Sequence, residues 1–222
     1  MTRKKKAGFA AIFDWDGVII DSSEFHERSW ELLAEEKGLY LPPDHFKKGF
    51  GMKNEEIIPG YLDWTSDPKE INALSVRKEE LYRELIKERG IAPLEGVKAF
   101  LDQLKESRIP CIVGSSTPRI NIDTIIDSLG FTGYFMDFIT AGDVKKSKPD
   151  PEVFLLAAER VGYAPGKCVV FEDALMGVEA GKAAGMKVVA ITTTNSADKL
   201  TEADVVVNRL DELTVDKLRN LF

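Results

Sequence analysis

A series of short, uniformly apolar runs separated by helical patterns constrains this chain more than any other feature. From about residue 93 onward, runs such as "CIVG", "CVVF" and "VVAIT" alternate with segments whose apolar residues recur at helical spacing. In one such segment, Val97, Phe100 and Leu104 share a helical face. Strands that are apolar throughout and separated by helices are typical of a parallel sheet with helices on both faces. We therefore predict a doubly wound α/β fold, to which the early run "FAAIF" at residues 9–13 also belongs.

Residues 21–92 interrupt this alternation. They contain no convincing strand and several helical patterns, punctuated by Pro42, Pro43 and a number of glycines. We therefore expect two domains: an α/β core made of residues 1–20 and 93–222, and an inserted all-helical cap of residues 21–92. Because the insert leaves the core directly after the first strand, it is well placed to act as a lid over a site there.

The composition excludes several classes of partner. The 222 residues carry a net charge of −7, which argues against a nucleic-acid-binding surface. No apolar run approaches the roughly 18 residues that a membrane-spanning helix needs. Cys111 and Cys168 lie in apolar, strand-like runs and are expected to be free thiols in a reducing compartment. We expect a cytoplasmic protein, a monomer or weak dimer, without a nucleic-acid or membrane partner.

The residues just after the predicted strands are polar. Three strands end on pairs of such residues: Asp14 and Asp16, Ser115 and Ser116, and Glu172 and Asp173. Since ligands of parallel sheets bind beyond the carboxyl ends of the strands, these groups are expected at one edge. Four carboxylates would repel one another, and a hard cation with oxygen ligands, most naturally Mg²⁺, relieves that repulsion. Any one of these residues alone could instead be a helix N-cap, but their presence at three strand ends favours a metal site.

Lys148 adds a positive charge to this set. It stands immediately before Pro149, in "SKPDP", ahead of a predicted helix with an Asp cap. A lysine in that place can balance a phosphate and the neighbouring carboxylates. Taken alone, the segment would equally fit a loop with a solvated lysine.

Four segments together carry a family resemblance. "DWDGVIID", "GSSTP", "SKPDPEVF" and "FEDALMGVEAGKAAGM" resemble the four ordered motifs of the haloacid dehalogenase superfamily. More narrowly, the chain is similar to the members with a small helical cap, the β-phosphoglucomutase-like and phosphoglycolate-phosphatase-like proteins. The resemblance covers nearly the whole chain. It implies a Rossmann-like core, an inserted helical cap and Mg²⁺-dependent phosphoryl transfer to and from a small-molecule phosphate ester.

The resemblance also assigns roles to the two acids of the first motif. It implies that Asp14 is the nucleophile, which forms an aspartyl-phosphate and splits one difficult displacement into two. It implies that Asp16 is the general acid and base, which protonates the leaving oxygen and later activates water. Residues two apart along an extended chain point to the same side, so both carboxylates can reach one phosphate.

The other motif residues take supporting roles in this scheme. The implied metal ligands are the carboxylates of Asp14, Glu172 and Asp173, with the backbone carbonyl of Asp16. Ser115 and Lys148 are expected to hold the phosphoryl oxygens, helped by backbone N–H groups around Ser116. Gly17 permits a tight turn after the two acids and is expected to border the bound substrate.

Four residues of the insert are candidates for contacts with the substrate. His26 matches a histidine of the β-phosphoglucomutases, although a capping or packing histidine would fit as well. Lys78 lies in the apolar stripe of its helix and is either a snorkelling lysine at the edge of the stripe or an inward lysine that reaches substrate. Lys53 and Asn54 lie in "GFGMKNEE", which resembles a substrate-specificity loop but would also fit a plain interhelical turn. The phosphonate-cleaving members that this chain resembles use a Schiff base and lack a carboxylate at the position of Asp16. Because Asp16 is present, Lys53 is expected to face solvent or substrate rather than form a Schiff base.

These residues favour a Mg²⁺-dependent phosphatase that acts on a small sugar or organic-acid phosphate. A β-phosphoglucomutase-type mutase is the main alternative. The lid loop of those mutases typically ends in an arginine where this chain has Asn54, and Pro118 and Arg119 replace their familiar lysine and asparagine. A bidentate arginine is well suited to hold a second phosphate, so its absence favours hydrolysis. A non-catalytic binding protein on the same fold is a third alternative, which the intact set of acids disfavours.

Overall fold

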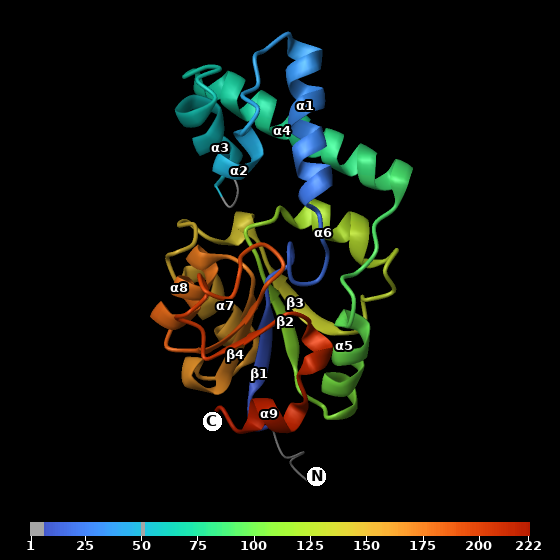
Figure 1. Ribbon diagram of the computed structural model, residues 1–222, viewed down its shortest axis with the longest axis vertical. Helices are drawn as coiled ribbons and strands as arrows, with labels where there is room; N and C mark the ends of the chain where they lie inside the picture. The colour runs from blue at the N-terminus through green and yellow to red at the C-terminus, as the bar shows by residue number, and fades with distance from the viewer. Residues whose placement is uncertain (1–6, 50–51) are drawn as a thin grey trace. The chain divides into compact units, whose positions relative to one another are not determined.

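The computed structural model describes residues 7–49 and 52–222, and they divide into two compact units. One unit consists of Met1–Asp21 and Ala92–Phe222, and the other is Ser22–Ile91. The first unit is built around a six-stranded sheet (Figure 1). Its strands are β1 Ala10–Phe13, β2 Cys111–Gly114, β3 Phe135–Ile139, β4 Cys168–Glu172, β5 Lys187–Ile191 and β6 Val205–Val207.

All neighbouring strands of this sheet are parallel, in the order β3-β2-β1-β4-β5-β6. The first strand of the chain thus lies in the middle of the sheet, between β2 and β4. The α-helices of this unit are α5 Val97–Glu106, α6 Arg119–Ile126, α7 Glu152–Val161, α8 Leu175–Ala183 and, after the last strand, α9 Val215–Arg219. Short 3-10 helices cover η2 Ala141–Asp143, η3 Pro165–Lys167 and η4 Leu210–Glu212. The predicted doubly wound parallel sheet is confirmed.

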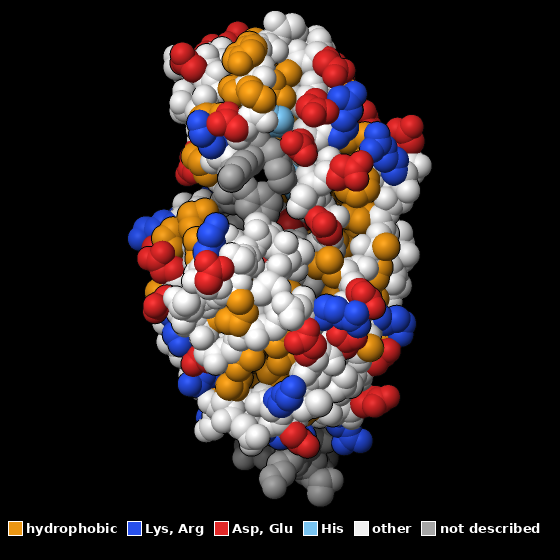
Figure 2. All heavy atoms as spheres, viewed as in Figure 1, with side chains coloured by type: hydrophobic (Ala, Val, Ile, Leu, Met, Phe, Trp, Pro, Cys, Tyr) orange, Lys and Arg blue, Asp and Glu red, His pale blue; other side chains and the backbone are white. Residues whose placement is uncertain are grey.

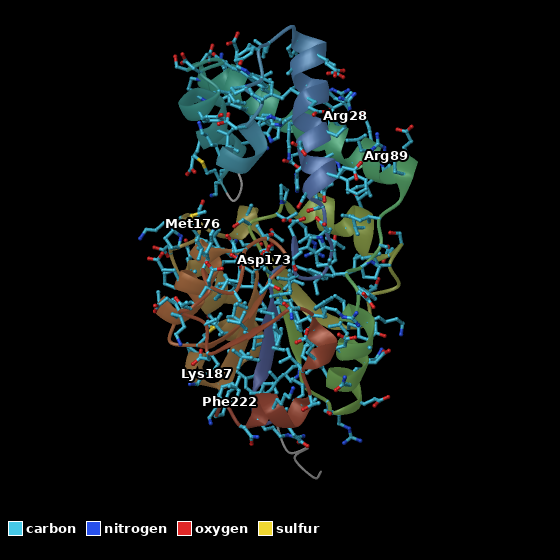
Figure 3. The ribbon with its side chains drawn as sticks, viewed as in Figure 1. Arg28, Arg89, Asp173, Met176, Lys187 and Phe222 are labelled. Carbon is cyan, nitrogen blue, oxygen red and sulfur yellow. The ribbon has the colours of Figure 1, made fainter. Side chains whose placement is uncertain are left out.

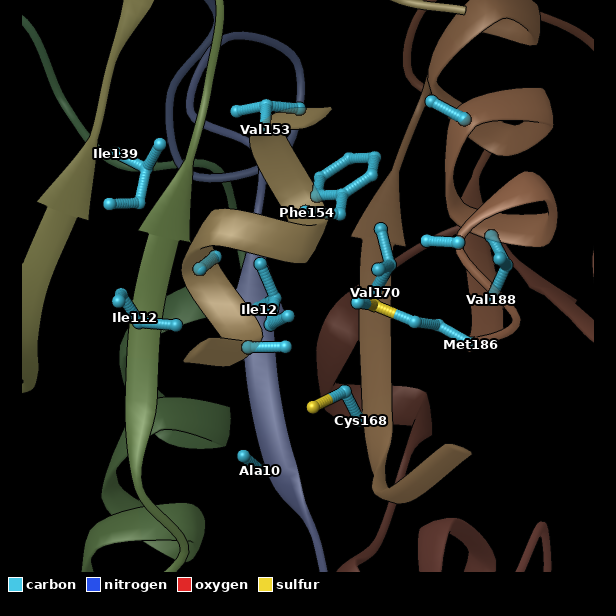
Figure 4. Close-up of a cluster of buried hydrophobic side chains, with 14 of the residues drawn as sticks. Ala10, Ile12, Ile112, Ile139, Val153, Phe154, Cys168, Val170, Met186 and Val188 are labelled. Atoms are coloured by element: carbon cyan, nitrogen blue, oxygen red, sulfur yellow. The ribbon is translucent and has the colours of Figure 1, made fainter. Parts of the chain in front are cut away.

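Both faces of the central strands are buried, which explains why β1 and β2 are apolar throughout and β4 is apolar up to its last residue. Successive residues of a strand point to opposite faces. On one face, α7 packs against β1, β2 and β3, and α8 against β4 and β5. Figure 4 shows the side chains of this face, with Ile12 of β1 beside Val170 of β4 and Phe154 of α7.

The opposite face is aromatic. Phe13 stacks on Phe171 of the neighbouring strand with the ring centroids 4.4 Å apart, and Phe100 of α5 meets both rings edge-on. Phe13, Phe100 and Phe171 are fully buried. Burying three such rings contributes several kcal/mol, on the order of 2 kcal/mol for each side chain. This packing anchors the ends of β1 and β4, next to which the acidic residues stand.

The regular secondary structure of the second unit, as far as the structure describes it, is helical. Its helices are α1 Ser23–Lys37, α2 His45–Gly49, α3 Asn54–Glu56, the π-helical turn η1 Ile57–Tyr61 and α4 Pro68–Arg89. Asp67 caps α4 by accepting a hydrogen bond from the N–H of Lys69 at 2.8 Å, and Pro68 takes the first helical position. The helices α1 and α4 pack along each other over an apolar core of Trp30, Leu33, Ile57, Ile58, Leu62 and Leu81.

The described surface is mixed in charge. Figure 2 shows acidic and basic side chains interspersed over the visible face. Arg77 of α4, for example, is surrounded by the carboxylates of Glu36, Glu80 and Glu84. None of the helices in the described part of the chain has the length and apolarity needed to cross a membrane.

Candidate active site

The ends of β1 and β4 bring the predicted acids together. The N–H of Asp14 donates to the carbonyl of Phe171 at 3.0 Å, which ties the end of β1 to the end of β4. Glu172 is the last residue of β4, and Asp173 comes directly after it. Asp14, Glu172 and Asp173 each place a carboxylate oxygen within 4.8 Å of the others, and all three residues are buried. Figure 3 labels Asp173 at this edge of the sheet.

Lys148 lies among these carboxylates. Its Nζ is 3.0 Å from Oδ1 of Asp14 and 2.5 Å from Oε1 of Glu172, and its side chain is 9% exposed. Burial alone would lower the pKa of Lys148, but the negative charges of Asp14 and Glu172 outweigh burial and raise the pKa above its ordinary value. The ammonium therefore stays charged at neutral pH.

One ammonium does not compensate three buried carboxylates. Burial raises the pKa of Asp14 to about 6; Lys148 lowers it, whereas Glu172 and Asp16 raise it further. Burial, together with the charges of Glu172 and Asp14, also raises the pKa of Asp173 well above its ordinary value. The cluster thus disfavours its own negative charge, and its donor set consists of oxygens. These properties fit a hard divalent cation such as Mg²⁺.

The carboxylate of Glu172 is held on both oxygens. Its Oε2 accepts hydrogen bonds from the backbone N–H groups of Asp173 and Ala174, each at 2.9 Å, while its Oε1 meets Lys148. Asp173 is held differently. Its Oδ2 accepts a hydrogen bond from the hydroxyl of Thr194, and its backbone carbonyl accepts one from Nδ2 of Asn195 at 3.0 Å.

Asp16 is half-buried and belongs to a chain of hydroxyls at the end of β2. The hydroxyl of Thr117 donates to Oδ2 of Asp16. The hydroxyl of Ser115 lies 3.2 Å from that of Thr117, and it accepts a hydrogen bond from the N–H of Thr117, also at 3.2 Å. Ser115 is buried, whereas Ser116 is exposed. The hydroxyl chain thus links the predicted phosphate-binding serine to the predicted general acid and base.

Gly17 closes the turn after the two acids. Its φ is +75°, a left-handed conformation, and its N–H donates to the carbonyl of Ile20 at 2.7 Å. A Cβ at this position would overlap with the carboxylate of Asp173. The backbone of Gly17 therefore lies against Asp173, and only glycine fits there.

Three residues at this edge have contacts that the sequence does not predict: Thr117, Thr194 and Asn195. Thr117 stands directly after the serines of the second motif, to which alone the sequence assigns a role. Thr194 and Asn195 lie just beyond β5, in the run "TTTNS". Polar residues after β1, β2 and β4 are the feature from which the other site residues are predicted. The run after β5 has the same feature, so it could have been used to find Thr194 and Asn195.

In the helical unit, Lys78 is an inward residue rather than a snorkelling one. It is 2% exposed, and its Nζ lies 2.7 Å from Nδ1 of His26 and 2.9 Å from Oε1 of Glu79. The rings of Trp30 and Tyr82 lie 5.6 Å and 5.5 Å from the ammonium. His26 stacks on Tyr82 with the ring centroids 4.2 Å apart.

Asn54 joins the same cluster. Its Nδ2 donates to Oε1 of Glu79 at 2.8 Å, the oxygen that also accepts from Lys78. Burial alone would raise the pKa of Glu79, but the charges of Lys78 and His26 and the hydrogen bonds from Lys78 and Asn54 outweigh it and lower the pKa to about 2. Lys53 is half-buried just before α3. Phe50 and Gly51 of the same predicted loop lie outside the described residues.

The chain belongs to the haloacid dehalogenase-like hydrolase family, whose model matches residues 10–185. This range contains the first three predicted motifs and all but the last residue of the fourth. The sheet, the ordered motifs and the acidic cluster define the class of protein, and the relatives place it within the family.

Known proteins similar to the chain include two phosphatases and a mutase. The chain is 33% identical to hexitol phosphatase A of Escherichia coli, over 94% of each chain. It is 34% identical to the chloroplastic 5-amino-6-(5-phospho-D-ribitylamino)uracil phosphatase of Arabidopsis thaliana, of whose length it spans 60%. The crystal structure of β-phosphoglucomutase from Clostridium difficile superposes with a TM-score of 0.84 at 26% identity, covering 97% of both chains. The family and its named phosphatases identify the chain as a phosphoric monoester hydrolase of the β-phosphoglucomutase-like branch.

Proposed function

We propose that this protein is a Mg²⁺-dependent phosphatase that hydrolyses a small sugar or organic-acid phosphate through an aspartyl-phosphate on Asp14. The observation that carries the proposal is the buried group of three carboxylates with a single ammonium at the carboxyl edge of the sheet. Such a group is unfavourable in itself and becomes useful when a cation and a phosphate complete it.

The metal would be held by the carboxylates of Asp14, Glu172 and Asp173 and by the backbone carbonyl of Asp16. When bound, Mg²⁺ neutralises carboxylate charge and lets an anionic phosphate approach an anionic nucleophile. Lys148 and Ser115 hold oxygens of the phosphoryl group, and backbone N–H groups around Ser116 support them.

In the first step, a carboxylate oxygen of Asp14 attacks phosphorus. A bond forms between that oxygen and phosphorus while the phosphorus–oxygen bond to the substrate breaks, and Asp16 gives its proton to the leaving alkoxide. In the second step, Asp16 takes a proton from water, which attacks phosphorus and releases inorganic phosphate and free Asp14. The hydroxyl of Thr117, by donating to Oδ2 of Asp16, orients that carboxylate for the proton transfer.

We propose that the unit Ser22–Ile91 is a cap that covers the substrate and excludes water during the first step. Within that unit, the ammonium of Lys78 is already neutralised by Glu79, and the amide of Asn54 is bonded to the same carboxylate. A cluster whose ammonium and amide are already bonded to a carboxylate suits the hydroxyl groups of a sugar or polyol better than a second phosphate. The names of the two phosphatase relatives are consistent with such substrates, since each contains a polyol chain, hexitol or ribityl.

The proposal is tested by measuring phosphate release from a panel of hexitol, pentitol, hexose and organic-acid phosphates. Each substrate is assayed with Mg²⁺ and with a chelator. We expect release from at least one polyol or sugar phosphate, abolished by the chelator and restored by added Mg²⁺. Equal release in the chelator would contradict the metal requirement.

A mutase is the second candidate, favoured by the likeness to β-phosphoglucomutase and by the contact of the buried Lys78 with His26. Asn54 weighs against it, because its amide is used within the cap and cannot replace a bidentate arginine at a second phosphate. The two are separated by supplying β-glucose 1-phosphate with a trace of the bisphosphate. We expect free phosphate to form faster than glucose 6-phosphate; rapid isomerisation with almost no phosphate release would establish the mutase instead.

A further inference from the structure

Gly177, in the first turn of α8, lies directly against the carboxylate of Glu172. A Cβ built on Gly177 would overlap with Oε1, Cδ and Oε2 of Glu172. Both residues are buried, and the N–H of Gly177 is already bonded within its own turn, to the carbonyl of Ala174 at 3.1 Å. The space that a side chain would take at residue 177 is therefore occupied by the end of the glutamate.

The other sides of this carboxylate are occupied as well. Lys148 meets Oε1, and the N–H groups of Asp173 and Ala174 meet Oε2. Glu172 is 1% exposed. The carboxylate cannot move away from residue 177 without giving up at least one of these contacts, which are charge-assisted hydrogen bonds in a buried place.

We propose that Gly177 is a positioning residue of the active site, which sets the place of the Glu172 carboxylate by having no side chain. The part of this proposal that concerns the metal rests on the proposed function, whereas the contact between Gly177 and Glu172 does not. A methyl group at residue 177 displaces the end of a flexible side chain rather than the backbone. The fold then survives, while Glu172 leaves Lys148 and the oxygen cluster.

Helix propensity predicts the opposite outcome for the same substitution. Residue 177 is helical, and alanine is a better helix former than glycine. If helix formation alone mattered, Gly177→Ala would stabilise the protein and leave its ligands unaffected. The substitution is thus informative, because the contact with Glu172 predicts a loss of stability where helix propensity predicts a gain.

Gly181, one turn further along α8, provides a matched control. A Cβ there would lie 2.8 Å from Cγ2 of Val188, an apolar neighbour in β5, and its next nearest neighbour would be Val170. Gly181→Ala therefore crowds the hydrophobic core beneath the same helix without touching an acidic residue. It should affect stability and leave metal binding unchanged.

The first experiment measures Mg²⁺ binding by titration calorimetry for the wild type and for each glycine variant. We expect Gly177→Ala to weaken Mg²⁺ binding about tenfold or more, equivalent to about 1.4 kcal/mol. The Mg²⁺ affinity of Gly181→Ala should stay within about twofold of that of the wild type, or about 0.4 kcal/mol on the same scale. Unchanged Mg²⁺ binding in Gly177→Ala, or an equal loss in both variants, would overturn the role of Gly177 at the metal.

A second experiment tests the contact without any metal. Glu172→Asp withdraws the carboxylate by one methylene, so it should make room for a methyl group at residue 177. Thermal unfolding in chelator is measured for the wild type, the two single variants and the double variant. We expect Gly177→Ala to lower the unfolding midpoint of the wild type and to be neutral or stabilising when Glu172→Asp is already present, a coupling that a double-mutant cycle isolates.

Equal effects of Gly177→Ala with and without Glu172→Asp would overturn the proposal. If Gly177→Ala alone does not fold, recovery of the fold in the double variant supports it, and failure of both contradicts it. A wild type that binds no Mg²⁺ would contradict the proposed metal, while the thermal cycle would still decide whether Gly177 positions Glu172.

Discussion

At the scale of single residues, the site combines groups that are unfavourable when it is empty. Asp14 and Asp173 are buried beside Glu172, and the ammonium of Lys148 pairs with Asp14 and Glu172. A raised pKa means that the folded protein resists ionising these acids. This arrangement is thus retained at some cost in stability, as is common where function requires strained or charged groups.

Asp14→Asn should separate activity from stability. The substitution removes the proposed nucleophile and one buried charge but keeps the size of the side chain. We expect phosphate release to fall by about three orders of magnitude or more. In metal-free buffer at pH 8, the unfolding midpoint should be equal to or higher than that of the wild type. Asp198→Asn, at an exposed position, is the control and should change neither quantity; a large loss of stability in Asp14→Asn would contradict the repulsion described for the cluster.

Asp16→Asn should distinguish the two steps of the reaction. A good leaving group such as nitrophenolate needs little protonation, whereas the attacking water always needs a base. With 4-nitrophenyl phosphate we therefore expect a burst of nitrophenolate and an accumulating phosphoenzyme, and with an alkyl phosphate no burst. The absorbance of nitrophenolate measures the burst. Rapid quenching and then phosphate analysis of the protein measures the phosphoenzyme. Equal losses for the two substrates without a trapped phosphoenzyme would count against the role of Asp16.

At the scale of elements, the helices α1 and α4 are joined by a polar contact inside an apolar interface. Lys78 of α4 meets His26 of α1 and its own neighbour Glu79, while Asn54 of α3 reaches the same glutamate. Breaking a buried ion pair by removing one partner leaves an uncompensated charge, which is more costly than replacing both partners.

Lys78→Met should therefore destabilise the protein by about 3 kcal/mol or more, because it leaves Glu79 buried without its ammonium. The double variant Lys78→Met with Glu79→Gln should recover much of that loss. Urea unfolding of the wild type, the single variants and the double variant measures the coupling. Additive effects of the two substitutions would show that the pair does not act as a unit.

The fold and the core of the site are largely predictable from the sequence, for identifiable reasons. Parallel strands have their carboxyl ends at one edge, so the polar residues next to the ends of β1, β2 and β4 are enough to gather Asp14, Ser115 and Glu172. The burial of Lys78 is not predictable in this way, because a helical stripe places a residue on a face but does not decide between its edge and its interior. The bond from Asn54 to Glu79 is not predictable either, since periodicity says nothing about which side chains meet across two helices.

At the scale of the whole molecule, folding and metal binding are linked through the pH. The pKa of Asp14 is raised from 3.8 to about 6, so between these values the folded state holds a proton that the unfolded state has released. The metal-free protein therefore loses stability as the pH rises from about 4 to about 6, and Asp173 acts in the same direction. A cation that binds the ionised acids reverses this trend.

We accordingly expect Mg²⁺ to stabilise the protein much more at pH 8 than at pH 5. At a concentration about a hundredfold above the dissociation constant, a ligand of the folded state adds about 2.7 kcal/mol. For a chain of this length that corresponds to a rise of roughly 5–10 °C in the unfolding midpoint. Scanning calorimetry with Mg²⁺ and with chelator at both pH values measures it, and Asp14→Asn should show a smaller difference. A Mg²⁺ effect of the same size at both pH values would contradict the linkage.

The central position of β1 has a consequence for how the chain is made. Its hydrogen-bonding partners are β2 and β4, which begin at Cys111 and Cys168. During synthesis from the N-terminus, this strand therefore leaves the ribosome about 100 residues ahead of its first partner and about 160 ahead of its second. The helices of Ser22–Ile91 pack mainly against one another, so we expect them to form while the first strand is still unpaired. Nascent chains arrested once α4, but not yet β2, has left the ribosome should then resist proteolysis within α1 and α4 but not in β1. An apolar strand exposed for that interval is a natural binding site for a chaperone.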